Sequence, residues 1–167
     1  KRLIEGGSIG RLVSIRALMG EHLPDVRPDY KTLFTAVYSG AFDLMHDIDL
    51  TLWYAGQPVR AVKSLWGSHS DIGIQAPDIV EILVDFQNRC TASVHLDFFQ
   101  RPRRRQMELI GTDGTILVEF AQWDRYTLSL FQPGMKDWKV ENHPTARDDM
   151  FRDEDLEFLN GITSEGE

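Results

Sequence analysis

The segment Asp78–Phe120 reads DIVEILVDFQNRCTASVHLDFFQRPRRRQMELIGTDGTILVEF, and it decides the fold. Apolar runs follow one another in this segment with only short turns between them. Asn88 marks a turn, Pro102 interrupts the chain, and Asp113-Gly114 is a strong hairpin signal. Strands in series joined by short turns form antiparallel pairs. We therefore expect four strands, over Asp78–Phe86, Cys90–Phe99, Arg104–Gly111 and Thr115–Phe120.

The flanking segments predict more strands and two helices. Apolar residues recur at helical spacing after Ser39, a plausible N-cap, and Gly56 and Pro58 end that pattern. Strands that follow one another, rather than alternating with helices, indicate an α+β fold. The expected fold is a large open, mostly antiparallel sheet with helices packed on one face, in one domain over residues 1–167. The further elements are strands Arg11–Leu18, Val59–Trp66, Tyr126–Phe131 and Trp138–Glu141, and helices Ser39–Tyr54 and Glu154–Ile162.

Composition excludes several classes of protein. The 167 residues are 42% apolar and 26% charged, which is ordinary for a globular domain and unlike a disordered chain. No apolar run reaches the roughly 18 residues that a membrane span needs. The formal net charge of −8 argues against a nucleic-acid binder. The single cysteine, Cys90, excludes an intrachain disulfide and a multi-cysteine zinc site, and its strand pattern predicts a small core residue.

The ends of the chain suggest a piece of a longer protein. The chain opens at Lys1 without Met or a signal peptide, and Lys1–Gly7 looks like a last helical turn stopped by glycine. The glycine-rich dinucleotide fingerprint is absent, because neither Gly6–Gly10 nor Gly111–Gly114 has its spacing between a strand and a helix. We expect a cytoplasmic protein whose N-terminal signals, if any, precede this sequence.

A polar cluster lies inside the most apolar predicted helix. In a continuous helix, Asp43 and His46 lie roughly 60° apart. A carboxylate beside an imidazole can orient it and raise its pKa, as a general acid or base requires. Two other interpretations are a solvated i,i+3 pair and a buried histidine satisfied by its neighbour. A metal site formed by Asp43, His46 and Asp49 is a third alternative, for which no outside ligand is indicated.

Two further segments are candidates for substrate contact. The stretch His22–Val37 is long for a loop, and long loops are often functional, although a plain surface excursion is the alternative. Four arginines, at positions 101, 103, 104 and 105, suit either a charged strand edge or contact with an anionic or hydroxyl-rich substrate. We single out Arg101 here, with His22, Arg27 and Tyr30 of the loop serving the same end. His69, His95 and His143 are isolated in sequence, which predicts structural or exposed side chains.

One face of the predicted sheet lacks a cover. Two helices are too few for so many strands, so we expect one face to expose apolar side chains. Open apolar sheet faces mark interfaces, which predicts a homo-oligomer formed through this face. The side chains expected there are Val94, Leu96, Phe98, Leu109 and Ile116.

Several of these segments together resemble a known family. The stretch Tyr38–Gly56 resembles Gly-Gly-x-x-x-Asp-…-His-x-x-Asp-…-Trp-…-Gly at the start of the C-terminal domain of the Gfo/Idh/MocA oxidoreductases. These are NAD(P)-dependent sugar and polyol dehydrogenases related to glucose–fructose oxidoreductase and inositol 2-dehydrogenase. Matches follow in the family's order over nearly the whole chain. They are Gly7–Arg11, Gly20–Asp25 with Arg27–Tyr30, Arg101–Thr115 and Met150–Phe158.

The resemblance carries expectations about fold, site and partners. It implies a C-terminal domain of the glyceraldehyde-3-phosphate dehydrogenase-like type, which binds substrate and mediates oligomerisation. NAD or NADP would be bound by an N-terminal Rossmann domain that this chain lacks. His46 falls on the family's proton acceptor and Asp43 on the residue that orients it, here three positions apart where many members have four. Ser39 replaces the first glycine, and Asp49 takes a structural role.

The expected function is that of the substrate domain of a dehydrogenase for a sugar, amino sugar, cyclitol or related polyol. The substrate is a small molecule, and we expect neither a nucleic-acid nor a membrane partner and no metal. The alternative is a binding or dimerisation domain that keeps the fold and has lost the chemistry.

Overall fold

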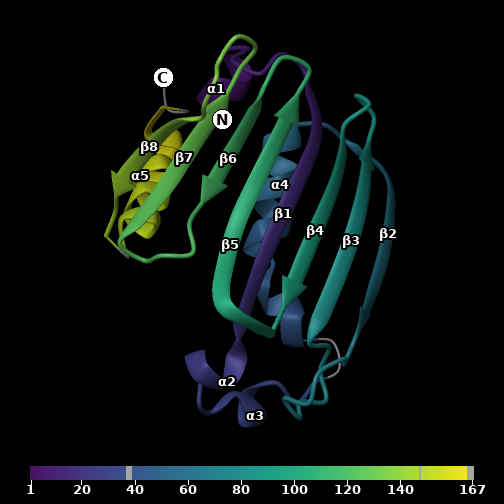
Figure 1. The fold of residues 1–167 in the computed structure, drawn as a ribbon. Coiled ribbons are helices and arrows are strands. Elements are labelled where there is room, and N and C mark those ends of the chain that lie inside the picture. Colours follow the sequence, from purple (N-terminus) through teal and green to yellow (C-terminus); the bar gives the residue numbers. More distant parts are fainter. Residues whose placement is uncertain (37–38, 147, 165–167) are drawn as a thin grey trace.

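A computed structural model describes residues 1–36, 39–146 and 148–164, and its centre is one open sheet (Figure 1). The sheet has eight strands in the order β2-β3-β4-β1-β5-β6-β7-β8. The strand bounds are β1 Leu12–His22, β2 Val59–Gly67, β3 Ile79–Phe86, β4 Thr91–Asp97, β5 Phe99–Gly111, β6 Thr115–Glu119, β7 Arg125–Phe131 and β8 Lys139–Pro144. The α+β fold with a large, mostly antiparallel sheet is confirmed.

Most strands of the sheet pair with their neighbours in sequence, and of the strands described β1 alone pairs with two strands that are distant in sequence. Each strand from β2 to β4 and from β5 to β8 pairs antiparallel with its neighbour in sequence. β1 lies between β4 and β5, parallel to the former and antiparallel to the latter. β5 passes through Pro102 without ending, so the expected interruption there is wrong. β5 is also central, so its arginines are not on a sheet edge.

Helices of different lengths lie around the sheet, and α4 covers its middle. α4 contacts β1 and β4 and lies behind β1 and β5 in Figure 1. The described part of the chain contains no helix long and apolar enough to cross a membrane. The bounds are α1 Arg2–Glu5, α2 Leu23–Val26, α3 Tyr30–Leu33, the 3₁₀ helix η1 Gly40–Leu44, α4 His46–Ala55 and α5 Asp149–Ser164.

The expected helix Ser39–Tyr54 is two helices. η1 ends at Leu44, Met45 forms the link, and α4 begins at His46. The Ser39 hydroxyl donates to the Ala36 carbonyl oxygen and caps no helix. At the other end the prediction is correct, since Gly56 adopts a left-handed conformation with φ of 59°. Tyr38, where the family resemblance begins, and Val37 lie outside the described residues.

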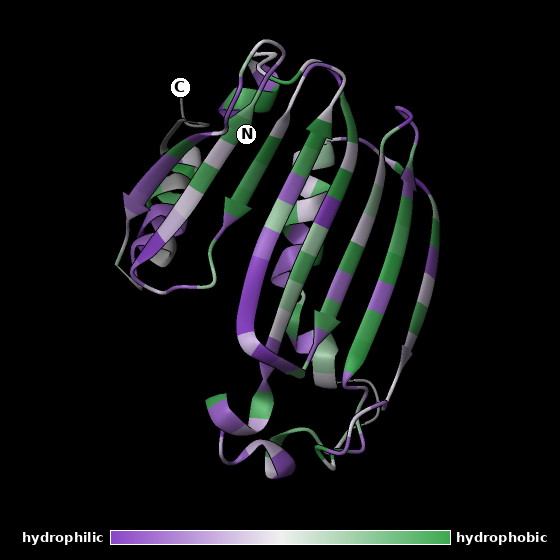
Figure 2. Cartoon of the chain, viewed as in Figure 1, coloured by the Kyte–Doolittle hydropathy of each residue, from purple (hydrophilic) through white to green (hydrophobic). Residues whose placement is uncertain are grey.

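The two faces of the sheet differ in cover, and the expected exposure of the apolar set is wrong. All five of those side chains are buried; Val94 and Leu96 are 0% exposed, because they share the face that α4 covers. Their alternate neighbours Ser93, His95 and Asp97 belong to the opposite, open face. Figure 2 shows the resulting mixture of polar and apolar bands along the strands. The apolar side chains that the open face does expose are Leu65, Leu83 and Val140.

Candidate active site

The segment that carries His46 is fixed by a close backbone contact. Gly40 has a φ of 71°, and a Cβ atom there would collide with the carbonyl oxygen of Pro77. Next to it, the Ala41 amide donates a hydrogen bond of 2.8 Å to that same oxygen. The turn before His46 is thereby attached to the loop between β2 and β3. Glycine at this position is a requirement of both conformation and space.

His46 and Asp43 both reach solvent. Asp43 lies in η1 and His46 is the first residue of α4, so the angle of a continuous helix does not describe them. Both residues are exposed. Within the described part of the chain, neither side chain has a hydrogen-bond or ion-pair partner. The imidazole and the carboxylate are therefore available to a ligand.

Asp47, the residue after His46, is buried and forms an ion pair. Asp47 is 1% exposed, and its Oδ2 and Oδ1 atoms lie 3.0 and 3.3 Å from Nε of Arg105 in β5. The Arg105 guanidinium also lies 4.6 Å from the centre of the Phe120 ring. Burial raises the pKa of the Asp47 carboxyl, and Arg105 opposes that rise. This ion pair attaches the first turn of α4 to the centre of the sheet.

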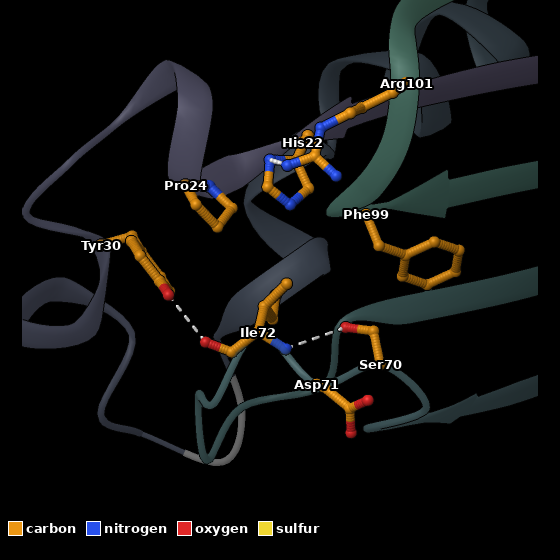
Figure 3. A pocket seen from close by; sticks show the side chains of 8 residues that line it. All are labelled: His22, Pro24, Tyr30, Ser70, Asp71, Ile72, Phe99 and Arg101. Atoms are coloured by element: carbon orange, nitrogen blue, oxygen red, sulfur yellow. Dashed lines mark hydrogen bonds between the residues drawn. The ribbon is translucent and has the colours of Figure 1, made fainter.

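Three of the four expected substrate contacts meet in one pocket. His22 ends β1, Tyr30 begins α3 and Arg101 lies early in β5. The pocket measures about 330 Å³ (Figure 3). Arg27 is exposed and lies outside this lining. The lining residues are His22, Pro24, Tyr30, Ser70, Asp71, Ile72, Phe99 and Arg101.

A carboxylate missed in the sequence organises the polar wall of this pocket. Asp25 accepts a hydrogen bond of 2.9 Å from Nε of Arg101, and its other oxygen is 3.0 Å from Nδ1 of His22. Nη2 of Arg101 lies 2.7 Å from the same Nδ1. Hydrogen bonding to Arg101 and then to His22 lowers the pKa of Asp25. The spacing His22-x-x-Asp25 was the available signal, because i,i+3 side chains are neighbours in a helical turn.

Two other buried carboxylates shape the loops around the pocket. Asp78 accepts hydrogen bonds of 2.7 and 2.8 Å from the amides of His69 and Ser70. Asp97 accepts 2.9 and 2.7 Å bonds from the amides of Phe99 and Gln100. Each is 1% exposed. Sequence alone gave no signal for either, since an aspartate beside a strand is ordinary.

His95 is not isolated. Its Nε2 lies 2.9 Å from Oδ2 of Asp97 and its Nδ1 lies 2.5 Å from Oε1 of Glu81. The hydrogen bond with Asp97 is the main cause that raises the pKa of His95 to about 9, and Glu81 adds to it. This histidine is therefore charged at neutral pH and holds two carboxylates together.

The arginine run resolves into a row of pairs along β5. Arg101, Arg103 and Arg105 are two residues apart, and each pairs with a carboxylate of a different element. The partners are Asp25 of α2, Glu21 of β1 and Asp47 of α4 respectively. Arg104, on the alternate position, donates to Gln106 instead. The row extends from the pocket to the start of α4.

The described residues contain neither a cluster of three metal-ligating side chains nor a glycine-rich turn between a strand and a helix. Among them, no group of three His, Cys, Asp or Glu side chains could hold a metal ion. The glycines at 6, 7 and 10 lie between α1 and β1, and those at 111 and 114 join β5 to β6. A pyrophosphate-binding turn requires the order strand, glycine-rich loop, helix, which neither segment has.

Comparison with known proteins follows this geometry. A family model described as the GFO/IDH/MocA C-terminal domain matches residues 1–117, which include β1, His46 and β5. The chain belongs to the Gfo/Idh/MocA family. The resemblance of the sequence is thereby confirmed, and the match is to the family's C-terminal domain. No curated protein matches the sequence.

Solved structures of oxidoreductases share the fold. An oxidoreductase from Agrobacterium radiobacter, in complex with NAD+, L-tartaric acid and magnesium, has 22% identity and a TM-score of 0.67, over 87% of this chain and 42% of its own. A levoglucosan dehydrogenase in complex with NADH and L-sorbose has 20% identity and a TM-score of 0.68, over 87% and 42%. UDP-N-acetylglucosamine 3-dehydrogenase from Acidithiobacillus ferrooxidans has 19% identity and a TM-score of 0.69, over 98% and 50%. The chain thus spans half or less of each.

Proposed function

We propose that this chain is the substrate-binding and oligomerisation domain of an NAD(P)-dependent dehydrogenase for a sugar, amino sugar, cyclitol or related polyol. The observation that carries the proposal is the exposed imidazole of His46, which has no hydrogen-bond or ion-pair partner among the described residues. The buried carboxylate of Asp47 next to it anchors the start of α4. Family membership and the sugar-type ligands of neighbours with the same fold support it.

In this proposal, one domain binds the cofactor and the other binds the substrate. The described residues include no glycine-rich turn between a strand and a helix, and we assign the binding of NAD or NADP mainly to a Rossmann domain outside this chain. NAD or NADP, when bound by that domain, would supply the hydride acceptor for oxidation of the substrate's carbinol carbon. On this chain, His46 accepts the proton of the substrate hydroxyl, and the exposed Asp43, which has no hydrogen bond to the imidazole, orients the substrate. A cytoplasmic location stays a prediction.

The pocket near His22 supplies substrate contacts in this proposal. Asp25 neutralises Arg101, and Asp71 adds a carboxylate to the lining, so the pocket has no excess of positive charge for a phosphate. The Tyr30 hydroxyl donates to the Ile72 carbonyl oxygen at 2.8 Å, which leaves its own oxygen as an acceptor. Carboxylate and hydroxyl acceptors suit a ligand with several O–H donors. Arg27, exposed on the same loop, would contact a substrate only beyond this lining.

The test is turnover of the full-length protein with a panel of polyols. His46→Gln should lower kcat by about 10²- to 10⁴-fold, the usual contribution of a general base. Cofactor binding should be unchanged, because the nucleotide site lies elsewhere. His143→Gln in β8 is the matched control, since that histidine stacks on Tyr126 far along the sheet. Full turnover by His46→Gln removes His46 from the mechanism, and an inactive wild-type protein favours a binding or dimerisation domain.

Self-association through the open face is the second part of the proposal. The corrected apolar residues there are Leu65, Leu83 and Val140, which are 60%, 59% and 53% exposed. Exposed apolar side chains on a sheet face favour contact with a second copy of the chain. Light scattering should give an oligomer at micromolar concentration, and Leu83→Glu should weaken it. A wild-type monomer at high micromolar concentration contradicts this part of the proposal.

A further inference from the structure

We infer that Asp47 and Arg105 are positioning residues for His46, and that together they set both the orientation and the protonation of its imidazole. The inference rests on the proposed function, since it assumes that His46 transfers the proton. It concerns residues that touch neither substrate nor cofactor. Their effect passes through the first turn of α4.

The ion pair between Asp47 and Arg105 fixes the first turn of α4, which carries His46. His46 is exposed and has no hydrogen bond or ion pair of its own among the described residues. The Asp47 side chain is buried, and its two carboxylate oxygens lie 3.0 and 3.3 Å from Nε of Arg105. Arg105 is held in turn by the Phe120 ring, and its own carbonyl accepts the Phe120 amide at 2.9 Å. The backbone of His46 is therefore anchored to the central strand β5 through its neighbour.

The same pair also balances charge beside the imidazole. The charged groups that act on Asp47 are Arg105 and Arg103 of β5 and His46 of α4 itself. Glu21 of β1 neutralises Arg103 with a contact of 3.0 Å, which leaves Arg105 and Asp47 as the balanced pair next to His46. Removing either member leaves one uncompensated charge close to His46. A positive remainder disfavours the imidazolium and a negative remainder favours it.

The two single substitutions therefore have opposite expected effects on the pH profile. Asp47→Asn leaves Arg105 positive, so the pH at which kcat falls to half on the acid side should move down by about half a unit. Arg105→Met leaves Asp47 negative, so that pH should move up by a similar amount. The double variant should return close to the wild-type profile. All three should lower kcat more than they raise KM, because the lost positioning acts in the transition state.

The experiment is the pH dependence of kcat and KM for the full-length protein and these three variants. Glu21→Gln is the matched control, because it breaks the neighbouring pair on the same face of β5, one step farther from His46. The control should lose stability, and its pH profile should move less than that of Asp47→Asn, because the Arg103 charge that it leaves lies farther from His46. A merely structural role predicts equal losses without opposite shifts, and that outcome overturns the inference. The inference is also overturned if the double variant does not fold while Glu21→Gln does, because the pair would then be needed for folding.

The two proposals fail in different ways. If His46→Gln keeps full turnover, the proposed function fails and the pair has nothing to position. If His46→Gln is inactive while the acid limbs of the single variants coincide with the wild type, His46 is catalytic and only the positioning inference is wrong.

Discussion

The two faces of the sheet use ion pairs of the same length for different purposes. On the covered face, Arg105 and Asp47 lie 3.0 Å apart, and their side chains are 15% and 1% exposed. On the open face, Arg16 and Glu108 lie 3.1 Å apart, and their side chains are 64% and 30% exposed. The N–O distances are nearly equal, so the two pairs differ in how deeply their side chains are buried and not in their length.

The difference teaches which charged residues carry structural weight here. A buried pair that loses one member leaves a charge without solvent, whereas an exposed pair returns its charges to water. The covered face therefore has few charges, and those described here connect β5 to other elements. The open face has many charges whose removal costs little. Substitutions matched across the sheet test this contrast.

The largest expected effect comes from apolar truncation on the covered face. Leu96 is 0% exposed, so Leu96→Ala should lower the free energy of unfolding by about 3 to 4 kcal/mol through lost burial and a cavity. Leu83 is 59% exposed on the open face, so Leu83→Ala should change it by less than about 0.5 kcal/mol. Urea denaturation of both variants measures the contrast. The comparison applies to the monomer, so it is made at a protein concentration below that of self-association. Equal losses under that condition would contradict the role given to burial.

The next effect concerns the ion pairs themselves. Arg105→Met should cost about 3 kcal/mol, because it leaves Asp47 buried without its partner. Arg16→Met should cost less than about 0.5 kcal/mol. Thermal or urea unfolding at neutral pH compares them, and a similar cost for both would refute the role given to burial.

The smallest of the three effects is pH-dependent and lies on the open face. The pKa of His95 is raised to about 9 from its ordinary value of 6.5, so its contribution to stability is complete below pH 6.5. It is lost as the pH rises through 9. With solvent screening we expect about 1 to 2 kcal/mol. The difference in unfolding free energy between wild type and His95→Gln should shrink between pH 6 and pH 10, and a constant difference would contradict the pairing with Asp97 and Glu81.

Local patterns predicted most elements of this fold. The hairpin at Asp113-Gly114 joins β5 to β6 as its turn chemistry requires, and all eight strands were expected within a few residues of their observed ends. The helix after Ser39 was less well predicted, because the 3₁₀ turn η1 depends on the contact between Gly40 and Pro77, which is not local. Pro102 was expected to stop a strand, yet β5 continues through it.

The site was only partly visible in the sequence. His22, Tyr30 and Arg101 were selected from a loop and an arginine run, and they do meet in one pocket. Asp25 and Asp47, which organise the surroundings of the pocket and of His46, were not selected. A carboxylate becomes informative only when its partner is known, and these partners are 76 and 58 residues away.

The sequence by itself determined most of the strands, their turns and the family, because each depends on residues close together in the chain. The alternation of each strand also divided its side chains into two sets. Only the tertiary structure decided which set is covered, since β1 joins the sheet between β4 and β5 and α4 then packs against β1 and β4. The same arrangement of strands places β5 inside the sheet and brings its arginines close to their carboxylate partners. Burial is a property of that assembly, and burial decides which of the ion pairs matters.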